Sequence, residues 1–120
     1  MRIAVVGISA SGKSTLAQEL CARGYDVHCL PQEHSGVRDL ALKLGYDLVV
    51  VLDAEIETVR RRRQVGYGPE RLQTERERLS AAIARALLHL HTDDLNAAGV
   101  ADRVEAALRM KGVEPDRDNA

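Results

Sequence analysis

The chain has 120 residues, 45% of them hydrophobic, which supports one small domain with a core that must be aliphatic because Phe and Trp are absent. A formal net charge of −1 gives no indication of nucleic acid or an anionic membrane as a partner. No apolar run approaches the about 20 residues of a membrane span, a signal peptide has no room before the first strand, and the two cysteines lack CxxC spacing, so we expect a cytoplasmic protein.

The chain opens with a predicted strand, a glycine-rich loop and a helix. Residues 2–6 form a β-branched run typical of a buried strand, and residues 13–23 have the apolar spacing of a helix. Between them, residues 7–14 read GISASGKS and match the phosphate-binding loop pattern GxxxxGK[ST] at every fixed position. In such a loop backbone N–H groups cradle anionic oxygens, Lys13 reaches the β/γ-phosphates and Ser14 ligates Mg²⁺. The residues expected to contact a nucleotide are Gly7, Ser9, Ala10, Ser11, Gly12, Lys13, Ser14 and Thr15.

The rest of the chain alternates predicted strands with predicted helices. Apolar residues fill every position of 48–52, which is typical of a buried parallel strand. Pro69 is a favoured first residue of a helix, and Asn96 is a good N-cap. The strands are expected at 27–30, 48–52 and 89–92, and the helices at 35–44, 56–64, 69–88 and 96–111.

This alternation predicts an α/β fold with a small parallel sheet flanked by helices. We expect residues 1–112 to form this single domain and residues 113–120 to form a flexible polar tail. The expected strand order across the sheet is 27–30, 2–6, 48–52 and 89–92. Ligands of such sheets bind beyond the carboxyl ends of the strands, so the candidate site residues are those after each strand: the 7–14 loop, Gln32–Ser35, Asp53 and Thr92–Asp94.

Several of these candidates have two interpretations. Asp53 is either the Mg²⁺-linked acid that follows a hydrophobic strand or a cap of the next helix. Glu33 is either a metal-linked acid and general base or a loop carboxylate at the start of a helix. His89 and His91 alternate and so share one face of a strand, either as a metal pair or as polar residues of an edge strand. The arginines at 60–63 either meet a ligand or form a solvated face.

Three segments of the chain resemble the P-loop nucleoside and nucleotide kinases, the group of adenylate, thymidylate and deoxynucleoside kinases. The first segment is the 7–14 loop, and the second is the strand ending in Leu52-Asp53-Ala54 with the arginine-bearing helix that follows. The third is His91-Thr92-Asp93-Asp94-Leu95 before the last helix. The resemblance implies a three-layer P-loop NTPase fold that uses ATP, or another nucleoside triphosphate, with Mg²⁺.

The resemblance also implies roles for particular residues. Residues 60–78 correspond to a lid, and Arg62 is the arginine that the likeness selects for the phosphoryl group. Glu33 matches the acid of the family's Asp/Glu-Arg-Ser element, in which His34 here replaces the arginine. The stretch before Leu48 is shorter than in the family, so the acceptor region is reduced or is completed by a second subunit, as in a homodimer.

Two functional hypotheses follow. In the first, the protein binds Mg·ATP and transfers the γ-phosphoryl group to a small acceptor such as a nucleoside or nucleotide, with Lys13, Glu33 and Arg62 as catalytic residues and Ser14, Glu33 or Asp53 as metal ligands. In the second, it is a nucleotide-responsive binding module with slow or no hydrolysis. The reduced acceptor region favours the second, and Glu33 with the arginine-rich lid favours the first.

Overall fold

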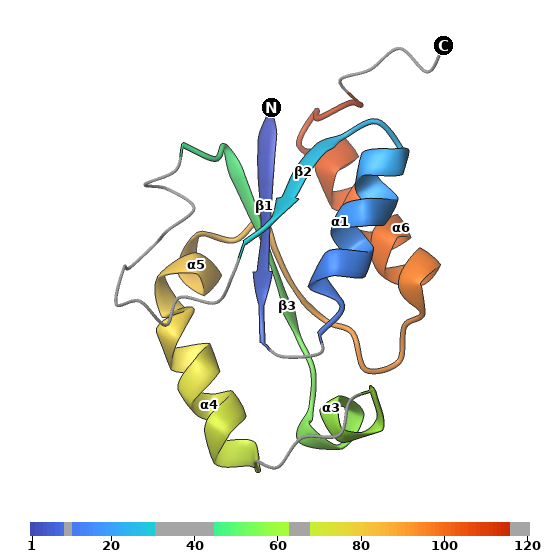
Figure 1. Cartoon of the computed structure of the whole chain (residues 1–120). Coiled ribbons are helices and arrows are strands. Elements are labelled where there is room, and N and C mark those ends of the chain that lie inside the picture. The colour runs from blue at the N-terminus through green and yellow to red at the C-terminus, as the bar shows by residue number, and fades with distance from the viewer. Residues whose placement is uncertain (9–10, 31–44, 63–67, 116–120) are drawn as a thin grey trace.

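The computed structural model describes residues 1–8, 11–30, 45–62 and 68–115. Both strands and helices are distributed along this part of the chain (Figure 1). The strands are β1 (Arg2–Gly7), β2 (Asp26–Cys29), β3 (Leu48–Asp53) and β4 (Leu88–His91). The helices are α1 (Lys13–Ala22), α3 (Ile56–Arg62), α4 (Pro69–Arg78), α5 (Ser80–Arg85) and α6 (Ala97–Met110). The expected helix at 35–44 lies outside the described residues.

The four strands form one parallel sheet in the order β2-β1-β3-β4. This order confirms the sequence prediction. Each end of each strand lies within one residue of its predicted position. Val5 pairs with Val50 in the centre of the sheet, and Asp53 pairs with His91 at its carboxyl edge. The ends of β1, β3 and β4 therefore meet at one edge, which brings the segments that follow them together.

Helices cover both faces of the sheet (Figure 1). On one face, α1 and α6 bury Leu16, Leu20 and Val104 against the side chains that β1 and β3 direct to this face. On the other face, Leu72 of α4 packs with Leu79 in a second cluster. Because side chains alternate along a strand, Ile3 and Val5 belong to the first cluster, and Ala4 and Val6 belong to the second. None of the helices in the described ranges combines the length and apolarity needed to cross a bilayer.

The predicted helix over 69–88 is wrong in its extent. The structure has two shorter helices, α4 and α5, with Leu79 between them in a non-helical conformation. Leu79 is fully buried, so the apolar spacing in the sequence continues through the break. The spacing alone therefore does not reveal that the helix is interrupted. The second helix ends early because the Leu87 amide donates to the Val49 carbonyl of the sheet at 2.8 Å, which requires extended backbone before β4.

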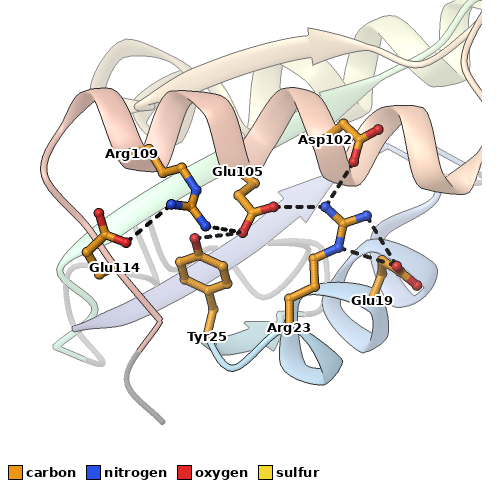
Figure 2. A network of polar contacts seen from close by, with 7 residues as sticks. All are labelled: Glu19, Arg23, Tyr25, Asp102, Glu105, Arg109 and Glu114. Carbon is orange, nitrogen blue, oxygen red and sulfur yellow. Dashed lines mark hydrogen bonds and ion pairs between the residues drawn. The ribbon is translucent and has the colours of Figure 1, made fainter. Parts of the chain in front are cut away.

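A network of polar contacts fastens the end of α1 to α6 (Figure 2). The Arg23 guanidinium donates to Glu105 and to Asp102, each at 3.0 Å, and the Tyr25 hydroxyl donates to Glu105 at 2.9 Å. Burial of Glu105 acts to raise its pKa, but the hydrogen bonds from Tyr25 and Arg23 outweigh it and leave that pKa below the ordinary value. The network therefore joins the C-terminal end of α1 to α6 on the same face of the sheet.

Candidate functional site

Two glycines of the 7–14 loop stand where the backbone requires glycine. A Cβ atom on Gly7 would lie 2.4 Å from the Leu52 carbonyl oxygen of β3, so a side chain cannot fit without displacing the sheet. Gly12, the N-cap of α1, has φ +99°, a left-handed conformation that costs other residues about 1–2 kcal/mol. Ser9 and Ala10, in the middle of the loop, lie outside the described residues. The fixed glycines of the sequence pattern thus coincide with the two positions that demand them.

The loop leads into the N-terminus of α1, which lacks acidic residues in its first turn. Lys13 folds back over the loop, with Nζ donating to the carbonyl oxygens of Gly7 at 2.9 Å and Ile8 at 3.3 Å. Ser14 is exposed, and its Oγ lies 3.9 Å from Sγ of Cys29 at the end of β2. The positive end of the helix dipole and the lysine charge act at the same place, so this end of α1 favours an anion.

A pocket of about 210 Å³ lies beside the start of α1. Three parts of the chain surround it: the start of α1 with the two residues before it, the end of α3, and the segment that joins β4 to α6. Its wall is part polar and part apolar, and the lining residues are Ser11, Gly12, Thr15, Leu16, Arg62, Thr92, Leu95, Asn96, Ala97 and Val100. The expected site residues Ser11, Gly12, Thr15 and Arg62 are therefore brought together in one cavity.

Thr92 joins three of the segments that surround this pocket. Its side chain is buried, and its hydroxyl donates to the Ser11 carbonyl at 2.9 Å, which ties the segment after β4 to the loop. The Arg62 guanidinium donates to the same hydroxyl at 2.9 Å and to the Thr92 carbonyl at 2.5 Å. Arg62 thus lines the pocket in a fixed orientation, whereas Arg61 donates to Thr58 of its own helix. The sequence places Thr92 after a strand, but its role as a connector was missed because its partners are 30 and 81 residues away.

Asp53 contacts the helix layer opposite α1. Its carboxylate is buried and accepts hydrogen bonds from Arg76 Nε, 3.0 Å from each oxygen, and from the Ala54 amide at 2.8 Å. The described contacts do not place Asp53 at the cap of α3, because Asp93 accepts the Glu55 amide at 2.7 Å instead.

Asp93, one of the candidate site residues after β4, accepts this hydrogen bond at the start of α3, a contact that the sequence analysis did not predict. The Thr58 hydroxyl also donates to its carboxylate, at 2.5 Å. Burial of Asp93 acts to raise its pKa, but the hydrogen bonds from Thr58 and the Glu55 amide leave that pKa below its ordinary value. The segment after β4 therefore positions α3, the helix that carries Arg62. In the sequence, the only indication of this contact is the pair of acidic residues at 93 and 94.

His89 and His91 share one face of β4, as their alternation predicts, and their ring centroids are 5.3 Å apart. The structure adds Asp53 of β3 beside them, with Oδ2 at 3.2 Å from Nε2 of His89. The sequence alone does not indicate this neighbour of the pair, because it comes from the adjacent strand and not from the neighbouring residues in the chain.

Glu33, the expected metal-linked acid, and His34 lie outside the described residues, as does Arg63. No model of a known protein family matches the chain, and a comparison with curated proteins gives no significant match.

Proposed function

We propose that the protein binds Mg·ATP, or another Mg²⁺-nucleoside triphosphate, at the 7–14 loop and transfers the γ-phosphoryl group to a small acceptor. The observation that carries this proposal is the geometry of the loop. Gly7 has no room for a side chain and Gly12 has a backbone conformation that favours glycine, and the chain passes from β1 through these residues into the N-terminus of α1. This turn directs the helix N-terminus and Lys13 toward the same point, which suits a chain of phosphates.

The phosphate groups would lie at the start of α1. Lys13 would leave the Gly7 and Ile8 carbonyls and donate to the β- and γ-phosphate oxygens, a charge-assisted interaction about twice as strong as a neutral one. Mg²⁺ would be held by the Ser14 hydroxyl with Glu33 as the associated acid, and it supplies positive charge to the transferring group. Asp53 is the alternative acid, but Arg76 already contacts both of its carboxylate oxygens.

The pocket beside α1 would take the nucleoside part of the nucleotide. Its apolar residues, such as Leu16 and Val100, offer a surface for a flat base, and Thr15 and Asn96 offer polar atoms. Its volume of about 210 Å³ is below the about 300–1,000 Å³ of common ligand pockets, so it suits part of a ligand and leaves the phosphates at the loop.

Arg62 would contribute to the transfer from the edge of this pocket. Its guanidinium is oriented by Thr92, and it lies on the same cavity as the loop residue Gly12. A cation in that position stabilises charge that develops on the transferred phosphoryl group. Fixing the side chain in advance reduces the entropy that must be lost when the nucleotide binds.

The experiment that tests the proposal is ADP release from Mg·ATP in the presence of nucleosides, nucleoside monophosphates and small hydroxylated metabolites. Lys13→Ala is the blank, because it removes the cation at the loop. A kinase gives ADP that depends on one class of acceptor and is absent from the blank. Tight Mg·ATP binding without stimulation by any acceptor supports the nucleotide-responsive module instead, and no binding of any nucleoside triphosphate refutes both.

Arg62→Ala and Arg61→Ala form a matched pair within this assay. Both remove a guanidinium from α3, but only Arg62 lines the pocket. We expect Arg62→Ala to lower the rate by about tenfold or more while changing the affinity for Mg·ATP less, and Arg61→Ala to resemble the parent protein. Equal rates for the two variants would exclude a role of Arg62 in the transfer.

A further inference from the structure

The carboxyl edge of the sheet holds a cluster of three metal-ligating side chains away from the pocket. Asp53 ends β3, and His89 and His91 lie on the neighbouring strand β4. Asp53 and His91 are paired across the two strands, and His89 is two residues earlier on the same face of β4 as His91. One potential ligand atom from each of the three side chains lies within 4.8 Å of the other two. The pairing of the strands thus brings together three groups that the sequence separates.

We propose that Asp53, His89 and His91 bind a late first-row transition metal ion, with Zn²⁺ as the foremost candidate. Two imidazole nitrogens and one carboxylate oxygen suit Zn²⁺, Co²⁺, Ni²⁺ or Cu²⁺, whereas Mg²⁺ and Ca²⁺ prefer ligand sets made of oxygen. The site therefore differs in chemistry from the Mg²⁺ site of the proposed function, and it stands whether or not the protein binds a nucleotide.

The geometry is close to that of a metal site. Zn–N and Zn–O bonds of about 2.0–2.1 Å in a tetrahedron place ligand atoms about 3.3 Å apart. Oδ2 of Asp53 and Nε2 of His89 are already 3.2 Å apart. The two histidine side chains are exposed, so their rings can rotate to close the remaining distance, and a water molecule would complete the fourth position.

Arg76 holds the carboxylate of this cluster in place. Its Nε lies 3.0 Å from both oxygens of Asp53, and a second guanidinium nitrogen donates to the Ala54 carbonyl at 2.9 Å. Asp53 is 2% exposed, so Arg76 provides the buried carboxylate with a charged partner and fixes its orientation. The metal would take Oδ2 while Arg76 keeps Oδ1 and the Ala54 carbonyl. The positive charge of Arg76 opposes the metal, so we expect reversible binding rather than an ion that is never released.

α4 and α5 cover one face of the sheet, and α1 covers the other (Figure 1). The cluster lies on the face of α4, because Arg76 of α4 contacts Asp53. A bound ion would join the edge strand β4 to β3, because two of its ligands are on one strand and the third is on the other. Metal binding is therefore expected to stabilise the fold by attaching an edge strand to the sheet.

The test is a titration of metal-free protein, without any polyhistidine tag or nucleotide, with Co²⁺ and Zn²⁺. We expect a visible Co²⁺ spectrum typical of nitrogen and oxygen ligands, saturation at one ion per chain, displacement by Zn²⁺ and a rise of the melting temperature with Zn²⁺. His89→Gln and His91→Gln should each weaken binding by at least about tenfold, because changing even a residue that only orients a metal ligand typically costs about 10- to 100-fold in affinity. Circular dichroism checks that these exposed substitutions leave the fold intact.

His28→Gln is the matched control. His28 is also an exposed strand histidine paired with a carboxylate, 2.7 Å from Asp26, but it is not a member of the three-residue cluster. We expect it to bind the metal like the parent protein. The proposal is overturned if the parent binds no ion, if His91→Gln binds as tightly as the parent, if His28→Gln is impaired equally, or if an intense thiolate band places Co²⁺ on a cysteine such as the exposed Cys29.

Discussion

Replacing Thr92 by valine removes one hydroxyl group from the centre of the candidate site while the side chain keeps its shape. The hydroxyl donates to the Ser11 carbonyl at 2.9 Å and accepts from Arg62 at 2.9 Å, and Thr92 is 1% exposed. Loss of such a hydrogen bond, with a buried carbonyl left without this donor, costs about 1–3 kcal/mol, so we expect a loss of about 2 kcal/mol. For 120 residues the entropy of unfolding is about 250 cal/mol/K, and the melting temperature should fall by about 8 °C.

The assay is urea unfolding and thermal melting of the parent and the Thr92→Val variant, with Thr74→Val as the control. Thr74 is exposed and its hydroxyl donates to the Glu70 carbonyl of its own helix at 3.0 Å, so the same chemical change there should alter stability by no more than about 0.5 kcal/mol. If Thr92→Val unfolds like the control, Thr92 does not connect the loop to the segment after β4, and the account of how the pocket is held together fails.

Two further predictions concern the loop and the network behind it. Gly7→Ala should destabilise the protein by about 3 kcal/mol in urea unfolding, because the new Cβ would lie 2.4 Å from the Leu52 carbonyl oxygen, and a variant as stable as the parent would contradict the close approach of β1 and β3. Glu105→Gln should cost about 1–2 kcal/mol at pH 7, because it removes the charge that accepts from Tyr25 and Arg23. Since the pKa of Glu105 is lowered below 4.5 in the folded protein, its contribution is present above pH 4.5 and is lost as the pH falls through the folded pKa. The variant should therefore lose less stability than the parent on acidification below pH 4.5, and equal acid dependence of the two proteins would exclude this role.

The sheet and its order could be predicted from the sequence because their signals are local. The apolar run of 48–52, the loop pattern at 7–14 and the N-cap Asn96, whose side chain accepts the Gly99 amide at 2.7 Å, each lie within a few neighbouring residues. Parallel strands joined by helices then leave few possible arrangements. The expected lid over 60–78 remains a prediction, since part of it lies outside the described residues.

The side-chain partners could not be predicted, because they depend on which residues the fold brings together. Asp53 was assigned either to Mg²⁺ or to the next helix, and neither interpretation includes Arg76, which is 23 residues further along the chain. In the same way, the break at Leu79 leaves the apolar period unchanged, and the end of the second helix is set by the hydrogen bond from Leu87 to the sheet. Periodicity describes one element at a time, whereas these features arise where two elements meet.

The measurement that tests the central proposal most directly is calorimetric titration of the parent and the Lys13→Ala variant with Mg·ATP. Lys111→Ala is the matched control, because Lys111 is an exposed lysine that follows α6. We expect the parent and the control to bind Mg·ATP alike, and Lys13→Ala to bind at least about 30-fold more weakly, which corresponds to the loss of about 2 kcal/mol from a charge-assisted hydrogen bond. Absence of binding to the parent, or equal affinity of Lys13→Ala and the parent, would contradict the proposal that this loop holds the phosphates of a nucleotide.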